Sequence, residues 1–139
     1  YEMLLKEKLI PILILLFSYD YIRESDDSHI TSENRRHIKS ALEYITDHYS
    51  EKISISEMAQ LAGFSENYFM SLFRQYVGMS CIQYVNHYRI QKAAHALEET
   101  TKSVSEIAMI HGFDNISYFN LQFRRTFGMT PREFRSKRK

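Results

Sequence analysis

Residues 54–64 are Ser54-Ile55-Ser56-Glu57-Met58-Ala59-Gln60-Leu61-Ala62-Gly63-Phe64, and 49 residues later the chain has Ser103-Val104-Ser105-Glu106-Ile107-Ala108-Met109-Ile110-His111-Gly112-Phe113. One inserted residue then changes the offset to 50, at which the following pairs match: Tyr68-Phe69 with Tyr118-Phe119, Phe73-Arg74 with Phe123-Arg124, and Gly78-Met79 with Gly128-Met129. Self-similarity at a fixed offset indicates two copies of one supersecondary unit.

Helix-capping residues mark where the helices of each copy begin. In a capping box, a Ser or Thr hydroxyl accepts a hydrogen bond from an amide of the first turn, and a Glu or Gln three residues later bonds back to the cap amide. Such pairs precede the short helix of each copy and the helix that follows each copy: Ser54 with Glu57, Ser103 with Glu106, Ser80 with Gln83, and Thr130 with Glu133. Pro131 takes the first position of the last helix, where proline is favoured.

A glycine separates a short helix from a longer one in each copy. Gly63 and Gly112 can adopt the left-handed conformation that ends a helix and turns the chain sharply. Ser65 and Asp114 can then cap the longer helices. These helices are predicted over about residues 65–77 and 114–127. Short helix, tight turn and longer helix make a helix-turn-helix unit, which is present twice.

The rest of the chain from about residue 34 also has a helical pattern. An amphipathic helix is indicated by residues at steps of three and four: Ile38, Ala41, Leu42, Ile45, His48 and Tyr49. Residues 81–98 contain no Gly or Pro and predict one continuous helix between the copies. With four Gly and two Pro in 139 residues, a turn-rich sandwich or barrel is disfavoured. We therefore predict an all-α protein of about seven helices, in which a long linker helix joins two helix-turn-helix units, plus an N-terminal apolar helix.

Residues 1–33 differ from the remainder in charge. They carry three basic and seven acidic residues, a net charge of −4, whereas residues 34–139 carry fifteen basic and ten acidic residues, a net charge of +5. This asymmetry indicates a polyanion-binding domain behind a segment of different purpose. A domain boundary is therefore predicted between residues 33 and 34.

The N-terminal segment contains nine consecutive apolar residues, Leu9 to Phe17. A membrane-spanning helix needs about 20, and no small-residue cleavage site of a signal peptide follows. A helix over about residues 3–22, kinked at Pro11, would be apolar on all sides, so we expect it to be buried against an upstream domain or a second copy of itself. The polar stretch that follows is predicted to be a linker. Because the chain begins at Tyr1, we expect it to be a fragment of a longer protein.

Residues 36–136 resemble the DNA-binding domain of AraC/XylS-type bacterial transcription regulators. The motifs that carry this resemblance are Gly63-Phe64-Ser65, Tyr68-Phe69, Phe73-Arg74, Arg89-Ile90 with Ala93 and Leu97, Ile107-Ala108, Gly112-Phe113, Tyr118-Phe119, Phe123-Arg124-Arg125, Gly128-Met129-Thr130-Pro131 and Phe134-Arg135. The resemblance implies a double helix-turn-helix domain over residues 34–139 that binds double-stranded DNA and usually activates transcription, with RNA polymerase as a partner. Residues 1–33 look like the remnant of a sensing and dimerisation domain, which implies a homodimer through residues 3–22.

The longer helix of each copy has an apolar stripe and an opposite outer face. The stripes, which should face the core, consist of Phe69, Leu72, Phe73 and Tyr76 in the first copy and Phe119, Phe123 and Phe127 in the second. The outer faces consist of Asn67, Met70, Ser71, Arg74 and Gln75, and of Ile116, Ser117, Asn120, Leu121, Arg124 and Arg125. A helix fits the major groove, where Asn can pair with adenine and apolar groups can contact the thymine methyl.

The predicted base-contacting residues come from these outer faces. They are Asn67, Met70, Ser71, Ile116, Ser117, Asn120 and Leu121. All but Asn120 also match positions that contact bases in the family. Two alternatives stay open: Ile116 and Leu121 could extend the core, and the four polar residues could be ordinary solvated side chains. Because the predicted base-contacting set contains no arginine to read guanine, we hypothesise A·T-rich sites.

Predicted phosphate contacts supply most of the affinity, because basic side chains neutralise phosphates and helix N-termini offer amides to them. The predicted residues are Ser65, Arg74, Gln75, Lys102, Asp114, Arg124, Arg125, Thr130, Arg132 and Arg135. Residues 137–139 could instead form a charged surface that only keeps the protein soluble. An 18-residue linker helix is about 27 Å long, and successive major grooves lie about 34 Å apart. One monomer is therefore expected to occupy adjacent grooves over about 20 base pairs, with some bending of the DNA.

The sequence contains no enzyme signature. Its histidines lack metal-site spacing, its glycines are isolated, and Cys81 is the only cysteine, so no disulfide can form within the chain. We expect no enzymatic activity, no metal, no cofactor, no membrane association and a cytoplasmic location. The alternative function is a helical protein–protein interaction module without DNA binding, which the basic residues and repeated capping boxes disfavour.

Overall fold

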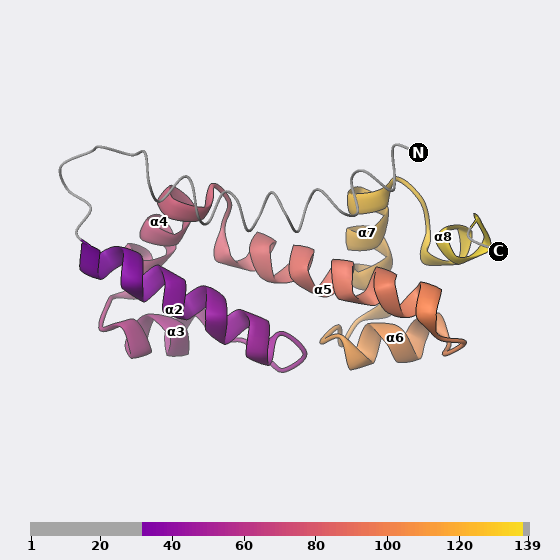
Figure 1. The fold of residues 1–139 in the computed structure, drawn as a ribbon, viewed down its shortest axis with the longest axis horizontal. Coiled ribbons are helices and arrows are strands. Elements are labelled where there is room, and N and C mark those ends of the chain that lie inside the picture. The colour runs from indigo at the N-terminus through magenta and orange to yellow at the C-terminus, as the bar shows by residue number, and fades with distance from the viewer. Residues whose placement is uncertain (1–31, 138–139) are drawn as a thin grey trace. The chain divides into compact units, whose positions relative to one another are not determined.

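The computed structural model describes residues 32–137. Within them the chain forms seven α-helices and no strand (Figure 1). The helices are α2 (Ser32–His48), α3 (Ile55–Ala62), α4 (Glu66–Val77), α5 (Cys81–Glu99), α6 (Val104–Ile110), α7 (Ile116–Phe127) and α8 (Pro131–Lys137). The predicted all-α class and the two helix-turn-helix units are confirmed. The apolar helix predicted over about residues 3–22 lies outside the described residues.

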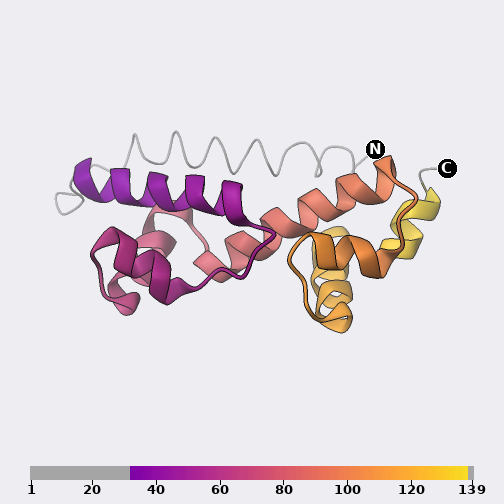
Figure 2. The same ribbon diagram turned by 90° about the horizontal axis from the view of Figure 1, so that it is seen from below.

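The described chain divides into two compact units, which consist of residues 32–48 with 53–84 and of residues 49–52 with 85–137. In the first unit, α2 packs along α3 and α4 (Figure 2). The predicted stripe of α4 is buried, and so are four residues of the stripe predicted for α2, whereas His48 and Tyr49 are partly exposed. The side chains that the three helices bury are Ile38, Ala41, Leu42 and Ile45 on α2, Met58 and Ala59 on α3, and Phe69, Leu72, Phe73 and Tyr76 on α4. The core of this unit is therefore the junction of its three apolar faces.

The second unit has an aromatic core. Helix α7 packs on both α6 and α8. Phe119 and Phe123 are fully buried, with their ring centroids 5.8 Å apart. Phe134 of α8 meets Phe123 edge-on at 5.3 Å and lies 5.0 Å from Phe127. Aromatic pairs at these separations add about 0.5–1.5 kcal/mol beyond the area they bury, so α8 is firmly attached to α7.

Capping boxes start three of the described helices. Ser103 and Glu106 exchange both bonds of the box, and so do the pairs Ser80 with Gln83 and Thr130 with Glu133. The Ser54 hydroxyl accepts a hydrogen bond from the amide of Glu57 at 3.4 Å, which is the first of the two bonds that define a capping box. The long helix predicted over residues 81–98 is confirmed as α5.

The predicted cap of α7 is wrong. Asp114 lies before the helix, and Asn115 is the cap, with its Oδ1 accepting from the amide of Tyr118 at 3.0 Å. The inserted residue of the second copy lies between the turn glycine and the cap, so Asn115, at an offset of 50, is the equivalent of Ser65. Both residue types are good caps, and the sequence matches on either side of the inserted residue do not choose between them.

Candidate nucleic-acid interface

Helix α4 presents a polar face opposite its buried stripe. The cap residue Ser65 accepts from the amide of Tyr68 at 3.2 Å, which fixes where the helix starts. The predicted DNA-facing residues of this helix are all exposed: Asn67, Met70, Ser71, Arg74 and Gln75. Met70, the only large apolar side chain among them, is 41% exposed. The face is therefore free to enter a groove.

Helix α7 repeats this arrangement. Its outer residues are exposed: Ile116, Ser117, Asn120, Leu121, Arg124 and Arg125. Ile116 is 40% exposed and Leu121 is 47% exposed. The alternative that these two side chains only extend the core is therefore wrong. An exposed apolar side chain on a largely polar helix face is suited to contact a thymine methyl group.

The predicted phosphate-contacting residues of the second unit differ in whether they are available to an anion. Lys102, Arg124, Arg125 and Arg132 are exposed and can reach an anion. Asp114 is exposed but does not cap α7, so the amides of that helix end belong to the Asn115 cap. The Thr130 amide already donates to the carboxylate of Glu133 at 3.3 Å. A phosphate at this helix end would meet that negative charge.

Arg135 differs from the other predicted phosphate-contacting arginines. It is half-buried, and its Nε donates to the carbonyl of Leu97 at 3.1 Å. Its Nη2 donates to the carbonyls of Thr100 at 3.4 Å and Lys102 at 2.7 Å. These three carbonyls lie in the last turn of α5 and in the loop that follows it, where the helix itself supplies no amide to bond them. We therefore assign Arg135 to the fold and leave it out of the phosphate set.

The turn of the second helix-turn-helix unit is built around Arg89, which the sequence reasoning did not single out as a site residue. Arg89 Nε donates to the Tyr49 carbonyl at 2.6 Å, and Nη2 donates to the Glu51 carbonyl at 2.7 Å. Its guanidinium lies 5.9 Å from the ring centroid of Phe113, the residue after the turn glycine. Burial lowers the pKa of Arg89, while the nearby charges of Asp114 and Tyr118 raise it. The only sequence signal was its place in the Arg89-Ile90 motif.

Gly112 lies directly against this arginine. Its φ is +92°, and a Cβ atom on it would lie 2.8 Å from both Arg89 Nε and the Tyr49 carbonyl oxygen. Only glycine therefore fits this turn without moving backbone atoms. Gly63, its counterpart in the first unit, has a φ of +77° but no atom within 4 Å of such a Cβ.

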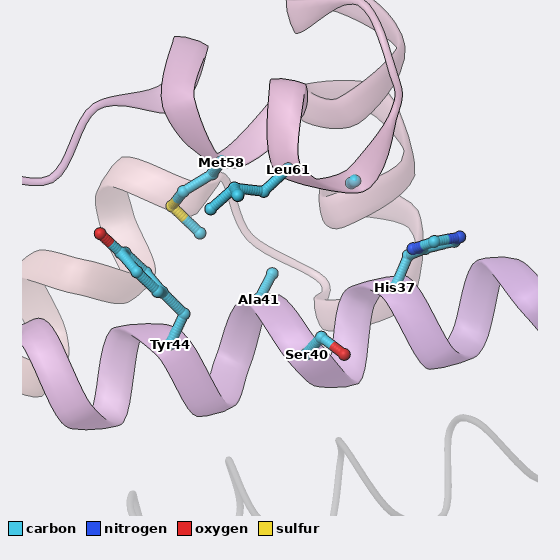
Figure 3. Close-up of a pocket in the computed structure, with 7 residues that line it drawn as sticks. His37, Ser40, Ala41, Tyr44, Met58 and Leu61 are labelled. Carbon is cyan, nitrogen blue, oxygen red and sulfur yellow. The ribbon is translucent and has the colours of Figure 1, made fainter.

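A groove of about 280 Å³ lies between α2 and α3 in the first unit (Figure 3). It is lined by His37, Ser40, Ala41, Tyr44, Met58, Leu61 and Ala62. The His37 ring meets Phe64 edge-on at 5.2 Å and lies 3.9 Å from the Glu33 carboxylate. None of the predicted DNA-contacting residues lines this groove.

Among residues 32–137, no helix has the length and apolar character that crossing a membrane requires.

Two helix-turn-helix units, each with an exposed polar face on its second helix, define the class of double helix-turn-helix DNA-binding domains. Residues 58–137 match the family model described as "Helix-turn-helix domain". The chain belongs to the AraC-type family of these domains, which are found in bacterial transcription regulators.

The similar proteins support this family assignment. The probable transcriptional regulator LumQ of Photobacterium leiognathi is 34% identical over 91 residues, which cover 66% of this chain and 37% of LumQ. The transcriptional activator RhaS of Enterobacter sp. (strain 638) is 31% identical over 105 residues, which cover 76% of this chain and 38% of RhaS. The chain thus spans less than two fifths of the length of these curated relatives.

Two solved structures have the same fold. An AraC-type transcriptional regulator from Chromobacterium violaceum matches with a TM-score of 0.68 and 28% identity, covering 78% of this chain and 96% of that chain. The DNA-binding domain of AdpA, solved in complex with a target DNA, matches with a TM-score of 0.69 and 26% identity, covering 72% of this chain and 90% of that chain.

Proposed function

We propose that this chain is the DNA-binding part of a bacterial transcription regulator, which inserts α4 and α7 into the major groove of duplex DNA. The observation that carries the proposal is the repeated outer face: two equivalent helices, each with a buried aromatic stripe, expose polar and apolar side chains suited to base edges. The similarity to the DNA-binding domain of AdpA, which was solved in complex with a target DNA, supports DNA binding by this chain.

We assign base contacts to the predicted residues of the two faces. In this proposal Asn67 and Asn120 pair with adenines, Ser71 and Ser117 contact either base, and the apolar side chains contact thymine methyl groups. The apolar side chains are Met70, Ile116 and Leu121, which are between 40% and 47% exposed. These assignments favour A·T-rich sites. Selection of bound duplexes from a random pool tests them, and G-rich cores would contradict them.

We assign phosphate contacts to the exposed members of the predicted set. These are Ser65, Arg74, Gln75, Lys102, Arg124, Arg125 and Arg132. Arg124 and Arg125 lie in the last turn of α7, beside the base-contacting face. The two helices proposed to enter the DNA, α4 and α7, are called the recognition helices below. They are proposed to occupy adjacent major grooves of one duplex over about 20 base pairs.

Three further proposals concern the whole protein. We propose that it activates transcription, as the printed name of RhaS states for that relative. RNA polymerase is then a partner, and residues 3–22, outside the described part, are proposed to form a homodimer contact. A regulator of bacterial promoters would act in the cytoplasm. The family consists of regulators that are generally not enzymes.

Duplex binding measured by fluorescence anisotropy at several salt concentrations tests the proposal. If about six phosphates are neutralised, a fourfold rise in salt lowers affinity on the order of a thousandfold. The double variant Arg124→Gln/Arg125→Gln should reduce the slope of log affinity against log salt by about 1.8. Lys39→Gln, which removes an exposed charge of α2 outside the predicted set, serves as the control. A salt-independent affinity would contradict DNA binding of this kind.

A further inference from the structure

A tyrosine occupies the same place in both recognition helices. Tyr68 is the third residue of α4, Tyr118 is the third residue of α7, and the two are 50 residues apart. They are 47% and 41% exposed, whereas the phenylalanine that follows each of them, Phe69 or Phe119, is fully buried. Each ring contacts the phenylalanine after the turn glycine: Phe64 at 5.0 Å and Phe113 at 6.2 Å.

Each tyrosine hydroxyl also has the same kind of partner. Asn34 Nδ2, on α2, donates to the hydroxyl of Tyr68 at 3.3 Å. Asn86 Nδ2, on α5, donates to the hydroxyl of Tyr118 at 2.8 Å. A tyrosine hydroxyl that accepts a hydrogen bond still has its own hydrogen to donate. Both hydroxyls are therefore fixed in place from one side and are ready to donate to an acceptor on the other.

The position of these hydroxyls fits a phosphate rather than a base. Tyr68 follows Asn67, and Tyr118 follows Ser117, so each tyrosine lies about 100° around its helix from the centre of the outer face. Side chains at the centre of that face meet the bases, whereas side chains at its flank meet the sugar-phosphate wall of the groove. The tyrosines also lie in the first helical turn, where the helix dipole favours a negative charge.

We propose that Tyr68 and Tyr118 each donate a hydrogen bond to a DNA phosphate at the edge of the groove that their helix occupies. Asn34 and Asn86 are then positioning residues, because they hold the hydroxyl without contacting DNA themselves. This inference rests on the proposed DNA binding. It adds a sequence-independent contact to each unit, and because tyrosine is neutral, that contact releases no counterion.

The variants Tyr68→Phe and Tyr118→Phe test this inference, because they remove only the hydroxyl. Each should weaken duplex binding about tenfold or more, as expected for a hydrogen bond to a charged acceptor, and the double variant about a hundredfold or more. The loss should be the same on specific and unrelated duplexes, and the salt slope should not change. Arg124→Gln should instead reduce that slope by about 0.9. Tyr44→Phe, in the groove between α2 and α3, is the matched control and should bind like the unchanged chain.

A double-mutant cycle tests the positioning role of Asn86. Asn86→Ala should weaken binding about threefold in the unchanged chain and have no further effect in the Tyr118→Phe variant. A threefold loss in both backgrounds would assign Asn86 an independent role and overturn this part of the inference.

The outcomes separate this inference from the proposed function. If the unchanged chain binds DNA and both Tyr→Phe variants bind equally well, the tyrosine contacts are refuted while DNA binding stands. If the loss appears on one base sequence only, the tyrosines contact bases and the phosphate assignment is refuted. If the unchanged chain does not bind duplex DNA at all, the proposed function itself fails.

Discussion

Replacement of the two turn glycines by alanine should have very different consequences. An alanine with positive φ costs about 1 kcal/mol relative to glycine at either position. At Gly63 nothing lies within 4 Å of the new methyl group, so this cost is the whole expected effect. At Gly112 the methyl carbon would lie 2.8 Å from the Tyr49 carbonyl oxygen, which is a backbone atom and cannot rotate away.

The additional cost at Gly112 follows from that contact. Overpacking of a tight site costs about 1–3 kcal/mol. The shift it forces also weakens the 2.6 Å bond from Arg89 Nε to the same carbonyl, and a hydrogen bond from a charged donor is worth about 1.5–3 kcal/mol. Gly112→Ala should therefore lower the free energy of unfolding by about 3–5 kcal/mol, against about 1 kcal/mol for Gly63→Ala.

Urea denaturation followed by circular dichroism measures this difference. Because the chain has two compact units, the data should be examined for two transitions, and the larger loss should fall on the transition of the unit that contains Gly112. Equal losses for the two variants, within about 0.5 kcal/mol, would refute the role given to the contact between Gly112, Arg89 and Tyr49.

Three other substitutions or reactions test separate parts of the structure. Arg135→Ala should lower the free energy of unfolding by about 2–4 kcal/mol, because three carbonyls lose a charged donor. Arg132→Ala, which changes an exposed residue of the same helix, should alter it by less than about 0.5 kcal/mol in the same denaturation assay. Equal effects of the two variants would contradict the structural role assigned to Arg135. Burial raises the pKa of the Cys81 thiol to about 12, so a thiol reagent at pH 8 should modify the native protein only as fast as it unfolds, and rapid stoichiometric labelling would count against this burial. Burial lowers the pKa of His87 below its ordinary value of 6.5; the unfolded chain then binds the additional proton first, so stability that is present above pH 6.5 should fall as the pH decreases below it. His87→Gln should make stability less dependent on pH between 7.5 and 5 in denaturation experiments, and an unchanged pH dependence would show that His87 is not the group responsible.

Features that depend on one turn of helix could be predicted from the sequence. The box of Ser103 and Glu106 forms because the two residues are three positions apart, whatever surrounds them. The buried stripes of α4 and α7 likewise follow from apolar spacing along each helix. The outer faces were predicted for the same reason, since a residue opposite a buried stripe is exposed.

The cap of α7 was mispredicted because the repeat alone does not say where its extra residue belongs. Asp114 and Asn115 are adjacent and both can cap a helix. The structure places the extra residue before the cap, at Asp114, and leaves Asn115 to cap the helix.

The two structural arginines could not be distinguished from surface arginines by sequence pattern. Arg89 bonds to a carbonyl 40 positions away, and Arg135 bonds to one 38 positions away. No helical period connects residues so far apart. Arg135 and Arg132 are three positions apart on α8, yet one is half-buried on carbonyls and the other is exposed. Only the packing of α8 determines which of them is available to DNA.

A hydroxyl-radical footprint on a duplex selected from a random pool tests the central claim most directly, namely that both recognition helices dock on one DNA molecule. We expect two protected tracts on the same face of the duplex, with centres about 10 base pairs apart. A single protected tract confined to one turn would contradict the claim, because only one of the two units would then be in contact with DNA.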